Sequence, residues 1–283
     1  MRKKIVYQGE AGAFSNLACQ TYFPDMEAVP CVSFADAFAQ VRNGHAELAM
    51  IPVDNTVAGR VSDIYYLLPE GGLHIIGEEY LPIHHQLLAV PGAVMSDIKT
   101  VRSHPMALGQ VRKRLQGWGI QPVADADTAG AARAISQLGD KSVGAIASVL
   151  AGEHYGLINL AENIEDAAHN TTRFLVLSKT AKIASKDSGP VVTSFVFKVR
   201  NVPSALYKAL GGFATNSINM TKLESYMVDG SFTATQFYAD VEGHPDDEGM
   251  KHAMEELQFF SETVKVLGCY IANPVRFQGK KDS

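Results

Sequence analysis

The stretch Leu48-Ala49-Met50-Ile51-Pro52-Val53-Asp54-Asn55-Thr56, residues 48–56, decides the fold class, because an apolar run passes directly into a polar segment. Such a short apolar run is typical of a strand, and the polar residues after it mark the strand's end. A similar run begins at Ile5, and residues 34–41 between the two runs show the i, i+3, i+4, i+7 spacing of a helix with one buried face. This alternation continues to about residue 180 and predicts an α/β fold with a parallel sheet.

The rest of this region predicts further strands at residues 87–90, 100–102, 121–124, 143–147 and 157–160, and helices at 62–68, 105–116 and 128–138. So many units favour two lobes over one sheet. We expect one lobe at about 1–78 plus 165–180 and the other at 79–164, with crossings near 78–82 and 174–178. A cleft between two lobes is the default place for a small ligand.

A second domain is expected after a linker at residues 181–190, where Lys, Ser, Asp and Gly interrupt the apolar pattern. Residues 191–276 then predict the order βαββαβ, the ferredoxin-like split unit. The expected strands are 191–199, 218–227, 231–241 and 264–271, and the expected helices are 203–214, with Pro203 in its first turn, and 246–260. Val228-Asp229-Gly230 is interpreted as a hairpin turn.

Composition excludes several function classes. Apolar residues make up 46% and charged residues 19% of the 283 residues, which is ordinary globular usage. The formal charge of -5 comes without a basic stripe, so we expect no nucleic acid as partner. No apolar stretch approaches the ~20 residues of a membrane span, and the N-terminal apolar run is too short for a signal peptide, so we expect a cytoplasmic protein. Cys19, Cys31 and Cys269 are expected to be buried free thiols.

Four polar clusters stand at predicted strand ends, where open α/β sheets present ligand sites. The first, residues 9–15, combines glycines with a helix start that can attract an anion, although a tight turn with Ser15 as a cap fits equally well. The second, 52–56, offers Asp54 and Asn55 as hydrogen-bonding groups, although both types also favour turns.

The third cluster is Ser103-His104-Pro105, with Gln110 further along the helix that Pro105 opens. A cap and a surface histidine are the alternatives to a site there. No spacing predicts a metal site, and His84 and His85, in a strand pattern, would point to opposite faces.

The fourth cluster is Asn170-Thr171-Thr172-Arg173-Phe174, which runs into the apolar residues 175–177. Its hydroxyls, amide and guanidinium can bind a carboxylate and a neighbouring hydroxyl. A strand start with a surface arginine is an equal alternative on these residues alone.

In this order the clusters resemble the prephenate dehydratase family over nearly the whole chain. The matching motifs are residues 9–15, 51–56, 103–108 with Gln110, and Thr172-Arg173-Phe174. Residues 203–206 and 218–225 are similar to an ACT domain. The resemblance implies a two-lobed catalytic domain like type II periplasmic binding proteins at 1–180 and an ACT regulatory domain at 191–276. Because the dehydratase pattern begins at once, a monofunctional form is expected.

The resemblance implies that prephenate loses water and carbon dioxide together in the cleft and yields phenylpyruvate for L-phenylalanine synthesis, with no cofactor or metal. It implies catalytic roles for Thr172, Asn55, Gln110 and Arg173. It implies substrate contacts from Ala13, Phe14, Ser15, Asp54, Thr56, Ser103, Thr171 and Phe174. A hydroxyl is a poor general acid, so we expect Thr172 to donate a hydrogen bond to the departing oxygen, while the proton donor stays open between Asp54 and other groups.

The ACT resemblance implies an L-phenylalanine effector site at a homodimer or homotetramer interface, formed by Asn201, Ala205, Leu206, Glu224 and Ser225. The chain departs from the family motifs where Met106 replaces a usual Gln, Ser204 a usual Gly, and Tyr226-Met227 a usual Arg-Pro. These departures leave the effector response less defined than catalysis. Two rival functions are an arogenate dehydratase and a non-catalytic amino-acid sensor.

Overall fold

The computed structural model describes residues 2–227 and 234–278, which form two compact units. The first unit is Met1–Val61 with Glu79–Phe174, and the second is Ser62–Glu78 with Leu175–Ser283. These two units are not the two predicted lobes, whose bounds stay a prediction. The segment Ser62–Glu78, which was expected in the first lobe, groups with the C-terminal residues.

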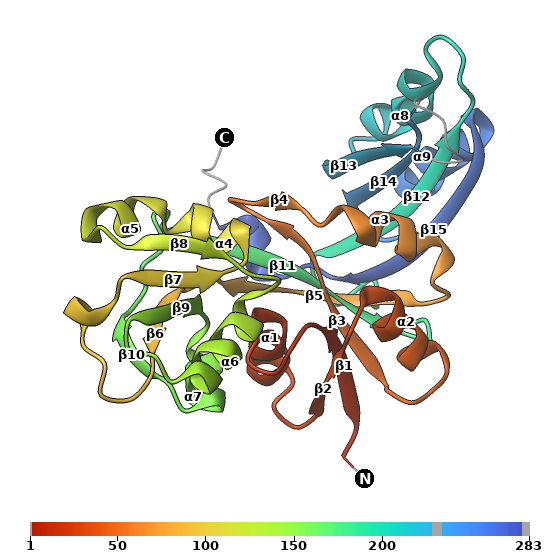
Figure 1. Cartoon of the computed structure of the whole chain (residues 1–283). Coiled ribbons are helices and arrows are strands. Elements are labelled where there is room, and N and C mark those ends of the chain that lie inside the picture. Colours follow the sequence, from red (N-terminus) through yellow and green to blue (C-terminus); the bar gives the residue numbers. More distant parts are fainter. Residues whose placement is uncertain (1, 228–233, 279–283) are drawn as a thin grey trace. The chain divides into compact units, whose positions relative to one another are not determined.

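The first part of the chain builds a sheet of strand order β2-β1-β3-β11-β5, with β4 paired to β3 (Figure 1). Strands β1, β2 and β3 are parallel, as predicted, and the helices that connect them have buried faces. Ser33 caps α2 by accepting a hydrogen bond from the Asp36 amide, and Gly44 follows its end with a φ of 78°. The elements are β1 Lys4–Gln8, α1 Phe14–Tyr22, β2 Glu27–Cys31, α2 Phe34–Arg42, β3 Leu48–Asn55, β4 Gly59–Arg60, α3 Ser62–Glu70, β5 His74–Pro82 and β11 Thr171–Ser178.

The second sheet has the order β10-β6-β9-β7-β8, and its two faces carry different helices. Leu87 and Val101 pack with α5 residues on one face, and Leu88 and Ala145 pack with α6 and α7 on the other. Figure 1 shows α5 on the opposite side of this sheet from α6 and α7. The prediction of a wholly parallel arrangement is wrong here, because β6 runs antiparallel to both β9 and β10. The elements are β6 Gln86–Ala89, the 3₁₀ helix Met95–Asp97, β7 Thr100–Ser103, α4 Pro105–Gln110, α5 Arg112–Trp118, β8 Gln121–Ala124, α6 Thr128–Leu138, β9 Val143–Ala147, α7 Val149–Tyr155 and β10 Ile158–Ala161.

The single helix expected at 105–116 is two helices, broken at Val111. The Gln110 carbonyl accepts a hydrogen bond from the Asp166 amide at 2.7 Å, and the Asp166 carboxylate accepts one from the Lys113 amide at 2.9 Å. A distant loop thus satisfies the backbone groups that the break exposes. The break ends α4 at Gln110, whose side chain belongs to the site described below.

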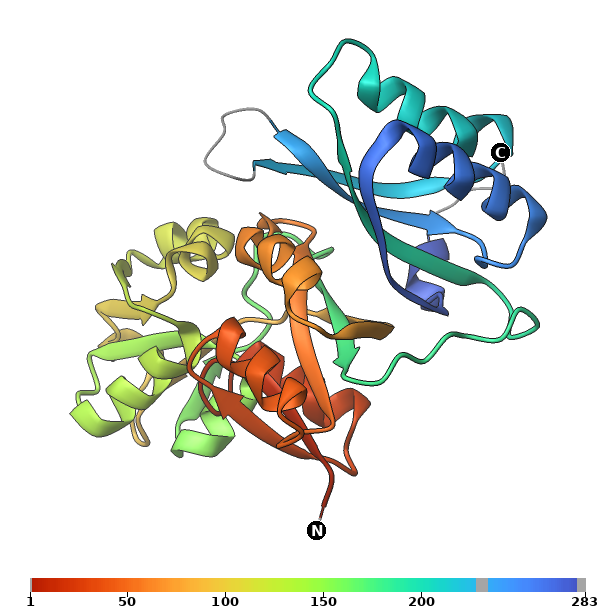
Figure 2. The same cartoon turned by 90° about the vertical axis from the view of Figure 1, so that its right-hand side faces the viewer.

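The C-terminal unit has the predicted order βαββαβ and the antiparallel sheet order β13-β14-β12-β15. Helices α8 and α9 lie side by side on one face of this sheet (Figure 2). Helix α8 begins at Ala205 after Ser204, which has a φ of 64°, so the prediction of Pro203 in its first turn is wrong. The predicted turn at 228–230 lies outside the described residues. The elements are β12 Val191–Val199, α8 Ala205–Thr215, β13 Met220–Met227, β14 Ala234–Glu242, α9 Glu248–Phe260, β15 Ser261–Ile271 and the 3₁₀ helix Pro274–Phe277.

Residues 62–78 belong to the C-terminal unit because they cover the other face of its sheet. The Tyr65 ring meets the Tyr238 ring edge-on at 5.2 Å, and the Tyr66 ring meets the Tyr226 ring at 5.4 Å. Gly268 on β15 lies so close to Ile75 that a Cβ atom there would overlap the Ile75 carbonyl. Strand β12 is therefore buried on both faces, and this burial accounts for its long apolar run.

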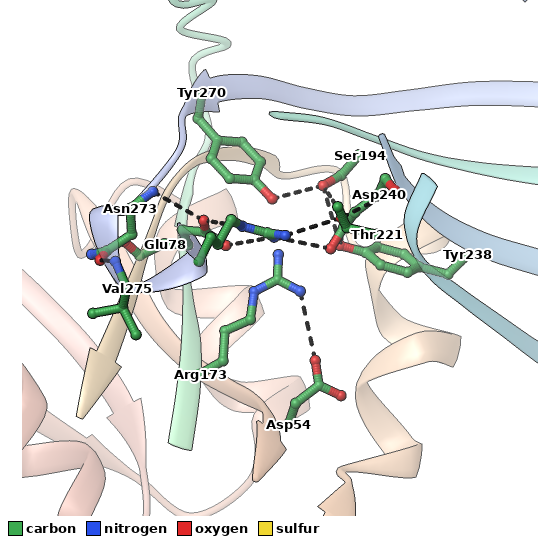
Figure 3. Close-up of polar contacts among 11 residues, drawn as sticks. Asp54, Glu78, Arg173, Ser194, Thr221, Tyr238, Asp240, Tyr270, Asn273 and Val275 are labelled. Atoms are coloured by element: carbon green, nitrogen blue, oxygen red, sulfur yellow. Dashed lines mark hydrogen bonds and ion pairs between the residues drawn. The ribbon is translucent and has the colours of Figure 1, made fainter. Parts of the chain in front are cut away.

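An ionic cluster on the same face consists of Glu78, Asp240 and Arg276 with the hydroxyls of Ser194, Tyr238 and Tyr270 (Figure 3). Arg276 donates Nε and Nη2 to the two carboxylate oxygens of Glu78 and also reaches Asp240 at 3.2 Å. Asp240 accepts from Ser194 at 2.5 Å and from Tyr238 at 2.6 Å. Buried carboxylates require such partners, and here an arginine and two hydroxyls supply them.

Candidate active site

A cavity of about 280 Å³ lies in the first unit, where β1 and β3 end and where β11, α1, α4 and α6 begin. Its polar lining consists of Gln8, Ser15, Asn55, His85, His104, Gln110, Asp127, Thr128 and Thr172. Its apolar lining consists of Gly9, Ala13, Phe14, Pro52, Ala58, Val61, Ile83, Met106, Ala107 and Phe174. A lining of this kind suits a small molecule with an apolar body and several polar groups.

The cavity gathers residues from all four polar clusters of the sequence. The predicted site residues that line it are Ala13, Phe14, Ser15, Asn55, Gln110, Thr172 and Phe174. They lie up to 161 positions apart in the numbering, from Ala13 to Phe174, and meet because strand ends and helix starts share one edge of the fold.

The side chains of Asn55, Gln110, Asn170, Thr172 and His85 form a hydrogen-bonded group that we call the amide cluster. Asn55 donates Nδ2 to Asn170 Oδ1 at 2.8 Å and to Thr172 Oγ1 at 2.9 Å. Asn170 donates to Gln110 Oε1 at 2.9 Å. The same Gln110 oxygen lies 2.7 Å from His85 Nε2. The cluster therefore joins four segments that are separate in the sequence.

The orientation of the Asn55 amide follows from its backbone contacts. Its Oδ1 accepts from the amides of Val57 and Ala58 at 2.9 and 2.7 Å, so Nδ2 must face Asn170 and Thr172. The Thr172 oxygen accepts a hydrogen bond from Asn55, so its hydroxyl proton stays available to donate to a ligand. Thr172 is thereby set up as a donor at the cavity wall.

Five predicted site residues do not line the cavity. Thr171 and Arg173 flank Thr172 on β11, so strand alternation turns both to the other face, and Asp54 at the end of β3 does not line the cavity either. There Arg173, which is almost fully buried, pairs with Asp54 at 3.6 Å (Figure 3). The expectation that Arg173 binds a substrate carboxylate in this cavity is therefore not supported by its position.

Thr56 and Ser103 hold strands together. The Thr56 hydroxyl donates to the His169 carbonyl at 2.6 Å and accepts from the Thr171 amide at 2.9 Å. The fully buried Ser103 hydroxyl donates to the Ile146 carbonyl at 2.6 Å and so links β7 to β9. Both hydroxyls are thus engaged with the backbone.

The first and third clusters also differ in detail from the expected caps. Ser15 lies inside α1, whose N-cap position is Ala13, and the Ala13 amide donates to the Glu10 carbonyl. At the third cluster the cap of α4 is His104, whose Nδ1 accepts from the Met106 amide at 3.2 Å. Gly12 has a φ of 85° and packs against Ala151, where a side chain would not fit.

Sequence reasoning treated Asn170 only as the amide of the fourth cluster and assigned no role to His85. Asn170 stands at the head of the fourth cluster, but its buried position before β11 was not evident from local spacing. His84 and His85 lie between β5 and β6, so the predicted strand there is wrong. Their side chains do differ in exposure: His85 is 2% exposed, whereas the His84 ring is half-exposed and pairs with Glu165 at 2.7 Å. Burial lowers the pKa of His85 and outweighs the opposing effects of Gln110 and Glu165.

Among the described residues, no group of three or more His, Cys, Asp or Glu side chains is placed to hold a metal ion. Over the same residues, no helix has the length and apolar character needed to cross a bilayer. The three cysteines are buried free thiols, as predicted, and burial raises the pKa of Cys19 to about 12.

The predicted effector residues occupy two places in the C-terminal unit. Asn201, Ala205 and Leu206 lie in the loop before α8 and in its first turn. Glu224 and Ser225 lie on β13, an edge strand, where Glu224 pairs with Lys222 at 3.0 Å.

The mixed α/β fold with a cavity at strand ends is typical of proteins that bind a small molecule. Residues 5–182 match the family model described as prephenate dehydratase. The chain is 48% identical over 272 residues to a bifunctional N-acyl-homoserine lactone acylase/prephenate dehydratase of Komagataeibacter europaeus, covering 96% of this chain and 97% of that protein. It is 42% identical over 287 residues to arogenate dehydratase/prephenate dehydratase 1, chloroplastic, of Arabidopsis thaliana, covering 96% of this chain and 73% of that protein.

A solved structure of an Arthrobacter aurescens prephenate dehydratase in complex with L-Phe is 29% identical and superposes with a TM-score of 0.87, covering 95% of this chain and 90% of that one. The chain belongs to the prephenate dehydratase family, as its sequence motifs indicated.

Proposed function

We propose that the chain is a carbon–oxygen lyase that converts prephenate to phenylpyruvate, for L-phenylalanine synthesis, in the cavity lined by the amide cluster. The observation that carries this proposal is the Thr172 hydroxyl, held by Asn55 so that its proton is available at the cavity wall. A donor fixed in advance stabilises the charge that develops on a departing oxygen. The ring hydroxyl of prephenate leaves in this way while the ring carboxylate leaves as carbon dioxide and the ring becomes aromatic.

The remaining lining fits the same substrate. The rings of Phe14 and Phe174 give the substrate ring an apolar surface, and poor solvation there favours loss of a carboxylate. The start of α1 at Phe14 and Ser15 presents backbone amides and a positive dipole end that suit a carboxylate. In this proposal no cofactor takes part, because aromatisation drives the elimination.

The test is to incubate the pure protein with prephenate and follow phenylpyruvate by its absorbance. A steady increase that depends on protein concentration supports the proposal, and no product overturns it in favour of a non-catalytic sensor. Comparison of kcat/KM on prephenate and arogenate decides which of the two substrates the enzyme prefers, since relatives carry both names.

A second activity deserves an assay because the Komagataeibacter relative is also named as an N-acyl-homoserine lactone acylase. Release of homoserine lactone from an N-acyl-homoserine lactone would add this activity. Loss of prephenate turnover but not of lactone release in a Thr172→Val variant would show that the two reactions use different groups.

We further propose that 1–180 is a two-lobed catalytic domain and that 191–276 is an ACT domain that binds L-phenylalanine. The relative solved with L-Phe and the observed order βαββαβ support this assignment. An edge strand such as β13 can pair with a second copy, which suits the proposed homodimer or homotetramer. Calorimetry with L-phenylalanine on wild type and Glu224→Gln tests the effector site, and no heat of binding would exclude it. A cytoplasmic location stays a prediction.

A further inference from the structure

Contacts of both the backbone and the ring hold His85 in place. Its amide donates to Glu165 Oε2 at 2.9 Å, and its carbonyl accepts from the Ile164 amide at 2.9 Å. The Phe14 ring meets the imidazole edge-on at 5.3 Å. Backbone and ring are therefore held before any substrate arrives.

The two ring nitrogens of His85 have different surroundings. Nε2 lies 2.7 Å from Gln110 Oε1, which can only accept, so Nε2 carries a proton. Nδ1 is buried and has no hydrogen-bond partner among the described residues. A buried polar atom without a partner is uncommon. Because the His85 side chain also contributes to the cavity lining, a bound ligand is the partner that this nitrogen lacks.

We propose that His85 is the general acid of the reaction and that Nδ1 delivers the proton to the departing ring hydroxyl. This inference rests on the proposed function. The Nδ1–H bond breaks and an O–H bond forms as the ring C–O bond breaks, so the hydroxyl leaves as water. The electron pair of the bond to the ring carboxylate enters the ring, and carbon dioxide departs. The imidazole is left neutral, and the solvent returns its proton before the next turnover.

The electrostatics of the site decide when Nδ1 is protonated. Burial and the neighbouring His84 favour neutral imidazole in the free enzyme, whereas Glu165 and the hydrogen bond to Gln110 favour the charged form. His104 and Asp127 also line the cavity. A bound dianion adds negative charge next to Nδ1 and raises the pKa of His85, so a proton is taken up with the substrate. Gln110, to which Asn170 donates, then holds Nε2 while Nδ1 reacts.

Two variants separate the roles of the two nitrogens. His85→Gln places an amide near the position of Nε2 and can keep the contact with Gln110, and His85→Asn places one near Nδ1. Neither amide can transfer a proton. We expect both variants to lose about 10²- to 10⁴-fold in kcat, with a smaller change in KM, while the control His45→Gln, at an exposed position, stays close to wild type.

The pH profile gives a readout that a structural role would not change. In wild type, kcat/KM should fall as pH rises through the pKa of His85 in the free enzyme, and the fall in kcat should come at higher pH because bound substrate raises that pKa. Both decreases with rising pH, in kcat/KM and in kcat, should be absent in His85→Gln. A His85→Gln enzyme with wild-type kcat overturns the proposal, and so does an active His85→Asn enzyme, which would show hydrogen bonding without proton transfer.

Circular dichroism establishes whether the variants fold. If they do not fold, the pH profiles of the wild-type enzyme decide. If kcat and kcat/KM fall at the same pH, the proposal is overturned. A wild-type protein that makes no phenylpyruvate refutes the proposed function itself, whereas an active wild type with an equally active His85→Gln refutes the role of His85 alone.

Discussion

The ionic cluster of the C-terminal unit and the amide cluster of the first unit are both buried and polar, but their polar groups are paired in different ways. Arg276 pairs with the carboxylates of both Glu78 and Asp240, and hydroxyl groups donate the remaining hydrogen bonds to Asp240. The amide cluster is made of neutral side chains, borders a cavity and leaves His85 Nδ1 without a partner in the described part of the chain. The difference indicates that the first cluster holds two segments together and that the second is arranged for a ligand.

The largest effect is expected from Arg276→Met, which leaves the buried carboxylates of Glu78 and Asp240 without their cation. Breaking a buried pair in this way costs about 3–5 kcal/mol of unfolding free energy. Denaturant unfolding measures it. The matched control is Lys3→Met, which removes the exposed pair with Glu47 and should cost less than about 1 kcal/mol. Equal losses in the two variants would remove the stabilising role of the ionic cluster.

Next in size is Thr172→Val, which removes the hydroxyl and keeps the shape of the side chain. We expect kcat on prephenate to fall by about 10²- to 10³-fold, far more than KM rises, with little change in unfolding free energy. Thr171→Val is the control, because Thr171 points to the other face of β11. If Thr171→Val lowers kcat as much, the assignment of Thr172 and not Thr171 to the cavity side of β11 is wrong. An unchanged kcat in Thr172→Val rejects the donor role.

Asn170→Ala should affect both stability and activity. It removes the partner of Asn55 Nδ2 and of Gln110 Oε1, both part-buried, and unfolding free energy should fall by about 1–3 kcal/mol. Because Asn55 and Gln110 then lose their orientation, kcat should fall as well. Asn43→Ala, at an exposed position, should change neither quantity in thermal unfolding and kinetic assays. A stable but fully active Asn170→Ala would separate Asn170 from the amide cluster.

The smallest effect is expected from Tyr226→Phe, at a position where the chain departs from the family motif. The Tyr226 hydroxyl accepts from Gln236 at 2.8 Å, and burial raises the Tyr226 pKa to about 12. Loss of this bond should cost about 0.5–1.5 kcal/mol of unfolding free energy and leave kcat unchanged, because the rings of Tyr65 and Tyr66 still pack on it. Tyr207→Phe, at a largely exposed position, should cost nothing measurable.

Much of the fold could be predicted from local patterns. The expected strands 143–147 and 191–199 match β9 and β12 residue for residue, because burial of successive side chains produces a continuous apolar run. Strand β2, with Glu27 and Pro30, and strand β5, with two glutamates, lack such a run and were not predicted as strands. The break at Val111 was also missed, because its cause is the loop at Asp166.

The sequence by itself determined where strands end and which polar residues follow them, since these depend on neighbours along the chain. Tertiary structure alone decided which of those residues meet. Asn55 and Thr172 are 117 positions apart, and Arg276 and Glu78 are 198 apart. No local periodicity encodes such pairs. The facing of each strand also turned Thr172 to the cavity and Arg173 away from it, because side chains alternate along a strand and only packing selects the buried face.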